Sequence, residues 1–174
     1  MATMSDTSFY EKLAATAKGF VLSTSPKRSG TNEPNPEAIL ATLSPDAEFT
    51  WGHTFFVGMT PMVQGTKSGQ GFVDNMSGIA SRLGTWDIKV NDEEVVVDEK
   101  KREVIVRASF SMQAKGQEPV LNDIIFWLKI TEDGEKVQKV KEFIDPTANA
   151  ELGKRIAASQ ESSSGNSTME GFQE

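Results

Sequence analysis

Residues 120–145, VLNDIIFWLKITEDGEKVQKVKEFID, decide the fold of this chain. Apolar and polar residues alternate on both sides of a central Asp-Gly dipeptide, which predicts two antiparallel strands joined by a tight turn. A three-residue loop at 132–134, with its glycine in the left-handed conformation, pairs Thr131 with Glu135. In that register, one face of the hairpin is apolar except for two polar residues, Asn122 and Glu142.

The register therefore decides which way Glu142 points. A two-residue turn would place Lys139 and Lys141 on the face that packs against the core, which is less favourable for a buried surface. In that case Glu142 would face solvent. With the preferred register extended to the preceding hairpin, the predicted inner face of the sheet consists of Phe110, Met112, Val120, Asn122, Ile124, Phe126, Val140, Glu142 and Ile144.

Composition limits the class of protein. The chain has 174 residues, a formal net charge of −7, no cysteine and one histidine. This size suits one domain, expected over 1–158. The negative charge disfavours a nucleic-acid partner or an anionic membrane surface, and a single histidine disfavours a transition-metal site. No apolar run is long enough to span a membrane and no secretory signal is recognisable, so a cytoplasmic location is expected.

The rest of the chain alternates between helical and strand periodicity. Helices are expected over 8–22, 37–43, 68–83 and 147–158, and strands over 47–53, 86–97, 103–114 and the two arms of 120–145. Residues 159–174 lack periodicity and are expected to form a flexible tail. The order predicts an α+β fold in which N-terminal helices cover the concave face of a curved antiparallel sheet.

Three polar residues are candidates for catalysis. Glu142 lies among apolar neighbours, and the loss of hydration there would raise its pKa towards the range that is useful for proton transfer. Asn122 can hold or polarise a substrate carbonyl, unless it only satisfies an irregular strand start. His53 has a suitable pKa for acid–base chemistry, unless it is a histidine with satisfied hydrogen bonds at a strand end.

The expected substrate-binding residues are large apolar side chains around this face. They are Trp51, Phe56, Met76, Phe110, Met112, Ile124 and Phe126. Trp51 belongs either to the pocket wall or to the core. The segment 54–65 is unusually apolar for a loop, so it either packs into the core or covers a pocket as a lid. On the opposite face, Trp127 and Phe143 indicate a surface that a second copy of the chain would cover.

Four segments together resemble the SnoaL-like proteins of the NTF2-like superfamily. They are LSPDAEFTWG, WDIKVNDEEVVVDEKKREVIVRASF, NDIIFWLKI and VKEFIDPTANAEL, within a resemblance that covers about 8–158. It is strongest to small fungal members whose last strand ends as KEFID does at 141–145. The resemblance implies a cone-shaped barrel with a deep pocket and a homodimer formed through the outer sheet face. The KEFID match carries over Glu142 as the pocket acid.

The same resemblance implies cofactor-free isomerases, cyclases or dehydratases that act on polyketide, terpenoid or alkaloid intermediates. Other members only bind ligands or proteins. The chain lacks the paired histidines and tyrosines of scytalone-dehydratase-like members, since its one tyrosine, Tyr10, lies in the first helix. The leading hypothesis is therefore a cofactor-independent isomerase or cyclase that acts on an apolar, carbonyl-containing secondary metabolite. The alternative is a non-catalytic small-molecule binder or protein adaptor.

Overall fold

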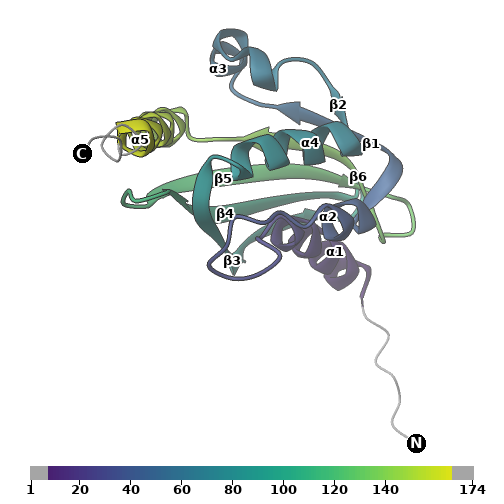
Figure 1. Ribbon diagram of the computed structural model, residues 1–174. Coiled ribbons are helices and arrows are strands. Elements are labelled where there is room, and N and C mark those ends of the chain that lie inside the picture. The colour runs from purple at the N-terminus through teal and green to yellow at the C-terminus, as the bar shows by residue number, and fades with distance from the viewer. Residues whose placement is uncertain (1–7, 166–174) are drawn as a thin grey trace, which may run out of the picture.

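The computed structural model describes residues 8–165 as an α+β fold around one six-stranded sheet. The strands lie in the order β2-β1-β6-β5-β4-β3. Their bounds are β1 Leu43–Trp51, β2 Lys67–Ser68, β3 Leu83–Asp98, β4 Glu103–Ala114, β5 Val120–Ile130 and β6 Val137–Phe143. The β1–β6 pair is parallel, unlike the predicted all-antiparallel sheet. The sheet curves strongly but stays open, so the expected barrel does not close (Figure 1).

Most of the helices begin where the sequence provides a capping side chain. The helices are α1 Phe9–Ser23, α2 Pro36–Ala41, α3 Thr54–Met59, the 3-10 helix η1 Pro61–Val63, α4 Gly69–Ala80 and α5 Pro146–Gly165. Ser8 and Glu11 form a reciprocal capping box at the start of α1, and the Asn35 side chain accepts a hydrogen bond from Ala38 N at the start of α2. Each cap satisfies backbone N–H groups that a helix leaves unpaired.

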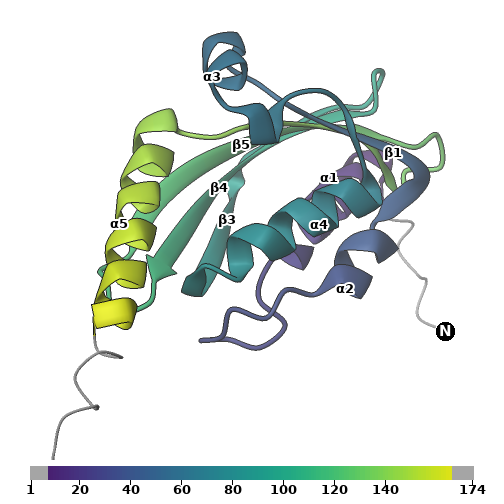
Figure 2. The ribbon, with the colours of Figure 1, turned by 45° about the horizontal axis from the view of Figure 1, so that its top comes forward.

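The N-terminal helices pack on the concave face, as predicted. α1 buries Phe20 against β3, β4 and β5, and the Phe20 ring meets the Phe126 ring edge-on at 6.0 Å. α4 packs on β1, where the Phe72 and Phe49 rings stack at 4.2 Å. At the other end of the sheet, α5 contacts β4 and β5 (Figure 2). The core therefore lies between one sheet face and the helices α1, α2, α4 and α5.

The register of the β5–β6 hairpin differs from the prediction by two one-residue shifts, which together leave the same residues on the inner face. Thr131 N bonds to Lys136 O at 2.9 Å, so the loop has four residues, 132–135, instead of three. A four-residue loop alone would turn Glu142 to the outer face. However, the pairing shifts by one residue between Lys129 and Ile130, and the strands continue with Glu142 opposite Phe126. Glu142 therefore lies on the inner face, as the sequence predicts.

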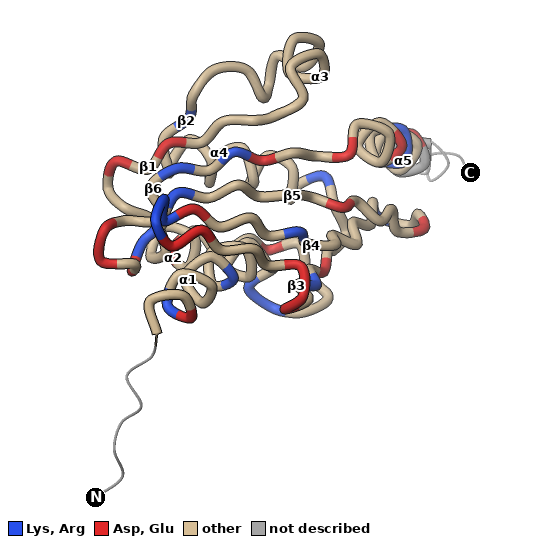
Figure 3. Tube along the Cα trace, turned by 180° about the vertical axis from the view of Figure 1, so that it is seen from behind, with Lys and Arg blue, Asp and Glu red and all other residues tan. Residues whose placement is uncertain are grey.

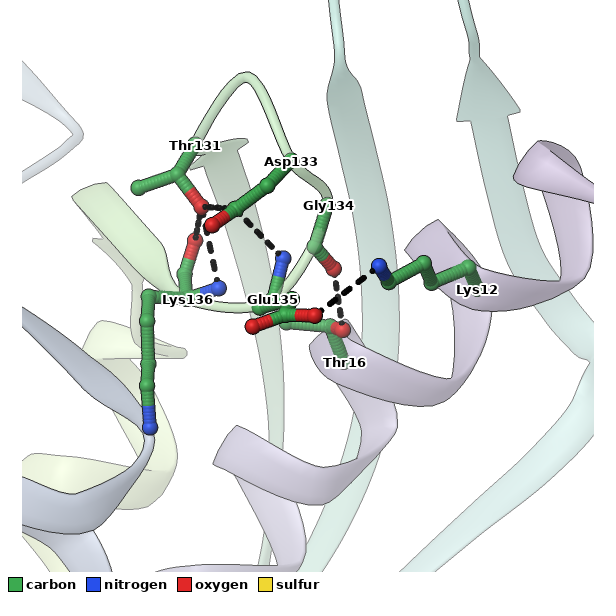
Figure 4. A network of polar contacts seen from close by, with 7 residues as sticks. All are labelled: Lys12, Thr16, Thr131, Asp133, Gly134, Glu135 and Lys136. Atoms are coloured by element: carbon green, nitrogen blue, oxygen red, sulfur yellow. Dashed lines mark hydrogen bonds and ion pairs between the residues drawn. The ribbon is translucent and has the colours of Figure 1, made fainter.

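Polar contacts fix this loop on α1 (Figure 4). The Thr131 hydroxyl donates to Asp133 Oδ1 at 2.6 Å, and that same oxygen accepts from Glu135 N at 3.0 Å. The Thr16 hydroxyl of α1 donates to the carbonyl of Gly134 at 2.6 Å. Gly134 has a φ of 78°, which favours glycine. The loop that sets the register is thus fastened to the core.

Three other segments differ from their predicted form. The segment 54–65 is not an irregular loop, because it contains α3 and η1. The short strand β2 was not predicted. α5 continues to Gly165, so the tail predicted over 159–174 is wrong for 159–165, and 166–174 lie outside the described residues. No helix within 8–165 is long and apolar enough to cross a bilayer.

Candidate active site

A cavity of about 240 Å³ opens on the inner face of the sheet. Its wall is made by the strands β1, β3, β4, β5 and β6 and by the helices α3, η1, α4 and α5. Most of the lining side chains are apolar. The lining residues are Trp51, Phe56, Thr60, Met62, Val63, Phe72, Asn75, Met76, Ile79, Ala80, Arg82, Leu83, Trp86, Phe110, Met112, Asn122, Ile124, Glu142, Ile144, Asn149, Leu152, Gly153 and Ile156.

Glu142 is the one carboxylate in this wall. It pairs with Phe126 of β5 on one side and with Trp51 of β1 on the other. Burial raises the pKa of Glu142 from 4.5 to about 7, while a hydrogen bond from the Trp51 indole N–H partly opposes the rise because it stabilises the charged form. The side chain keeps some accessible surface, but that surface faces the cavity. Near neutral pH the group can therefore both accept and return a proton.

Gly52, the residue that follows β1, holds the backbone of Glu142 through a close contact that only glycine allows. Gly52 N donates to the Glu142 carbonyl at 2.7 Å. A Cβ on Gly52 would lie 2.1 Å from ring carbons of Phe143, so any other residue would displace that ring. The Trp51-Gly52 step thus brings an indole N–H and a backbone N–H to the same glutamate.

Asn122 is buried, with 2% of its surface exposed, and its amide is oriented by the backbone. Its Oδ1 accepts a hydrogen bond from Asp145 N at 3.2 Å, which fixes the oxygen on that side. The Nδ2 group finds no acceptor among the hydrogen bonds of residues 8–165, and Asn122 lines the cavity. Asn122 therefore presents N–H donors to a bound molecule, which suits a carbonyl or enolate oxygen.

Eight of the ten predicted site residues line this one cavity. They are Glu142, Asn122, Trp51, Phe56, Met76, Phe110, Met112 and Ile124. For the six on strands, the sequence predicts the shared face because strand residues two apart point to the same side of a sheet, whereas Phe56 and Met76 reach the cavity from α3 and α4.

The other two predicted residues lie elsewhere. Phe126 is 1% exposed and packs beneath Phe20, so it belongs to the aromatic core instead of the cavity wall. His53 follows β1 in the left-handed conformation, with a φ of 58°, and is exposed. Its ring meets the Phe143 ring edge-on at 5.3 Å, outside the cavity lining. The chain turns after Gly52, so the strand alternation that placed His53 inside does not extend to it.

Several polar lining residues were not predicted. Asn75 of α4, Arg82 just after α4 and Asn149 of α5 all contribute to the wall. Asn149 shares a helical face with Leu152 and Ile156, at spacings of three and seven, which was a usable signal. Asn75 had no such signal, because the position of α4 above the sheet is set by tertiary packing.

Within residues 8–165, no group of three or more His, Cys, Asp or Glu side chains is arranged to hold a metal ion. The cavity's polar groups are instead one carboxylate, one guanidinium, amides, the Thr60 hydroxyl and the Trp51 indole N–H, whereas the Trp86 indole N–H donates to Thr24 O at 3.0 Å. This set can transfer a proton and hold an oxygen atom without a bound cofactor.

Solved structures share this architecture, although no protein-family profile and no curated protein matches the sequence. PrhC from Penicillium brasilianum is 25% identical over 88% of this chain and 93% of its own, with a TM-score of 0.69. BvnE pinacolase from Penicillium brevicompactum is 17% identical over 88% and 99%, also with a TM-score of 0.69. A Jannaschia protein described as a candidate SnoaL-like polyketide cyclase is 11% identical over 89% and 98%, with a TM-score of 0.61. This chain therefore has the fold of the NTF2-like and SnoaL-like proteins among these structures.

Proposed function

We propose that the protein is a cofactor-independent isomerase or cyclase that acts on an apolar, carbonyl-containing secondary metabolite by proton transfer. The observation that carries this proposal is Glu142, a lone carboxylate in an apolar cavity wall whose pKa is raised to about 7. An acid–base group is most effective when its pKa lies near the working pH. The apolar lining would exclude water and strengthen the polar contacts with the substrate.

The reaction would use a proton acceptor, Glu142, and a hydrogen-bond donor, Asn122. Ionised Glu142 would remove a proton from a carbon next to the substrate carbonyl, and the C–H electron pair would pass into an enolate. The amide N–H of Asn122 would stabilise the enolate oxygen. Protonated Glu142 would then deliver a proton to a different carbon of the enolate. In ring closure, the enolate carbon would instead bond to a second carbonyl carbon, whose C=O π electrons would move to its oxygen, and that oxygen would take the proton from Glu142.

Solved structures with a similar fold support this class of reaction. BvnE is described as a pinacolase, and a Bacillus subtilis neighbour as a candidate isomerase. TerC was co-crystallised with polyporic acid, a small organic molecule. These descriptions concern other chains, but they make rearrangement of a small molecule the preferred reaction class for the cavity described above.

The test is proton exchange on a simple apolar ketone. Solvent deuterium exchange into 2-tetralone, followed by NMR, reports abstraction of a proton next to a carbonyl without knowledge of the natural substrate. We expect the wild-type protein to accelerate exchange, with kcat/KM rising as Glu142 ionises through about pH 7. Glu142→Gln should lower the rate by about 100-fold or more.

Glu132→Gln is the matched control, because Glu132 is an exposed glutamate on the loop of the same hairpin. Its rate should equal that of the wild type. A folded Glu142→Gln variant with the wild-type rate would remove Glu142 from the mechanism. A wild-type protein that binds 2-tetralone without accelerating exchange would favour the alternative, a non-catalytic binding protein.

The outer sheet face supports a second proposal, that the protein is a homodimer. Leu121, Ile125 and Trp127 of β5 are 64%, 41% and 45% exposed on that face. Charged residues of both signs lie along the neighbouring strands (Figure 3), and Arg107 forms ion pairs with Glu94 and Asp123. Such an apolar strip with a charged rim is typical of an interface. Sedimentation as a monomer at micromolar concentration would contradict the proposal.

A further inference from the structure

Arg82 is the one cation among the residues that line the cavity. It lies between the end of α4 and the start of β3, and it is exposed. Its Nε–H donates to the carbonyl of Gly78 at 3.1 Å, in the last turn of α4. This bond orients the guanidinium and leaves its two terminal nitrogens available to a ligand.

The guanidinium of Arg82 has no carboxylate partner within the described part of the chain. By contrast, three of the other four arginines, Arg28, Arg107 and Arg155, each form an ion pair there, and Arg102, which does not line the cavity, forms none. This contrast is notable in a chain with a net charge of −7, where acidic side chains outnumber basic ones. An unpaired arginine at a binding cavity is suited to an anionic oxygen group, because its planar fork can bind two oxygens at once.

Arg82 and Glu142 occupy different ends of the cavity. Glu142 lies at the end of β6, in the middle of the sheet, whereas Arg82 precedes β3, which is an edge strand. A guanidinium close to Glu142 would lower the pKa of that carboxyl, yet its pKa is set by burial and by Trp51. Apolar side chains, among them Ile79 and Phe110, line the space between the two ends.

We infer that the cavity binds an apolar molecule that carries a carboxylate, with the carboxylate held by Arg82 and the apolar body extending towards Glu142. The inference rests on the proposed function for the second of these contacts. Asn75 precedes Arg82 by two helical turns and also lines the cavity, so it adds a neutral donor on the same side. The expected ligand is therefore a small, largely apolar carboxylic acid and not a neutral lipid.

The test compares two probes of nearly equal shape, trans-cinnamate and cinnamyl alcohol. Trp51 and Trp86 line the cavity while Trp127 lies on the outer face, so the indole N–H signals of the full chain report binding with an internal control. Titrations followed by NMR at pH 6 and low salt would keep the acid ionised and Glu142 mainly protonated. We expect cinnamate to bind about fivefold more tightly than the alcohol, as suits a partly solvated ion pair.

Arg82→Gln should abolish this preference by weakening cinnamate alone, and Arg82→Lys should keep part of it. Arg28→Gln, which removes an arginine outside the cavity lining, should change neither affinity. Equal affinities for both probes in the wild type, or a preference that survives in Arg82→Gln, would overturn the inference.

The two proposals can fail separately. If Glu142→Gln abolishes proton exchange while Arg82→Gln leaves the probe preference unchanged, the proposed function stands and the carboxylate inference falls. If the Arg82 variants behave as expected while Glu142→Gln exchanges protons normally, the reverse holds. If neither probe shifts the Trp51 and Trp86 signals, the carboxylate inference falls, and deuterium exchange into 2-tetralone still decides the proposed function.

Discussion

The inner face of the sheet has two halves that differ in what covers them. In the first, which we call the filled half, Phe20, Phe49, Phe72 and Phe126 pack ring to ring with centroids 4.2 to 6.2 Å apart. In the second, the hollow half, the same strands carry Trp51, Asn122 and Glu142 into a cavity. Phe72 belongs to both, because it stacks on Phe49 and also lines the cavity.

The difference shows that helix placement, and not strand pattern, creates the site. β5 alternates in the same way along its whole length, with Asn122, Ile124 and Phe126 all directed inward. α1 delivers an aromatic ring onto Phe126, whereas no helix delivers one onto Asn122. A polar side chain on an inner face is tolerated where space remains for a ligand and a backbone partner.

The largest expected effect comes from truncating one large side chain in each half. Phe126→Ala should destabilise the protein by about 3–5 kcal/mol, because it empties a packed position under Phe20. Met112→Ala should cost only about 1 kcal/mol, because Met112 is half-buried and already faces a cavity. Urea denaturation at one pH measures both free energies of unfolding.

Equal losses in these two variants would contradict the division into a filled and a hollow half. Ligand affinity tests the same division in a second way. Met112→Ala should change the affinity of trans-cinnamate, since Met112 lines the cavity, whereas a mild core variant such as Phe126→Leu should leave that affinity unchanged.

A smaller effect follows from the pKa of Glu142. Because burial raises this pKa from 4.5 to about 7, the folded state binds more protons than the unfolded state between those values. The stability contributed by the protonated group is fully present below pH 4.5 and is lost as the pH rises through about 7. Glu142→Gln stays neutral, so at pH 8 it should be more stable than the wild type by on the order of 2 kcal/mol.

That difference should shrink towards zero at pH 4.5, where both side chains are neutral. Glu132→Gln again serves as the control, with no pH-dependent difference from the wild type. Urea denaturation at pH 4.5, 6 and 8 gives the comparison. A constant difference across this range would mean that Glu142 is hydrated in the folded state and that the hollow half is open to water.

The sequence predicts the faces of the strands better than their connections. The bounds of β4 and the shared inner face of Phe110 and Asn122 follow from alternation alone. The β5–β6 loop does not, because a four-residue loop and a bulge near Gln138 together give the same orientation of Glu142 as the predicted three-residue loop. The alternation of apolar and polar residues shows only the face on which a residue lies, so two one-residue shifts of register leave no trace in it.

The parts of the site contributed by helices were harder to predict. Asn75 and Arg82 are recognisable only once α4 is placed above the sheet, since no periodicity in the sequence sets that placement. α5 extends to Gly165 through a serine-rich stretch without apolar periodicity, where the Ser159 hydroxyl bonds to Lys115 O at 2.7 Å. A tertiary contact of this kind overrides weak local propensity.

The smallest expected effect defines where the hollow half ends. His53 lies just past Gly52, exposed and with a φ of 58°, and its ring rests on Phe143 outside the cavity. His53→Asn should change the free energy of unfolding by no more than about 0.5 kcal/mol, because asparagine tolerates the left-handed conformation and little buried surface is lost. It should also leave deuterium exchange into 2-tetralone within about twofold of the wild-type rate. A large loss of exchange in this variant would extend the site across Gly52 and make His53 part of it.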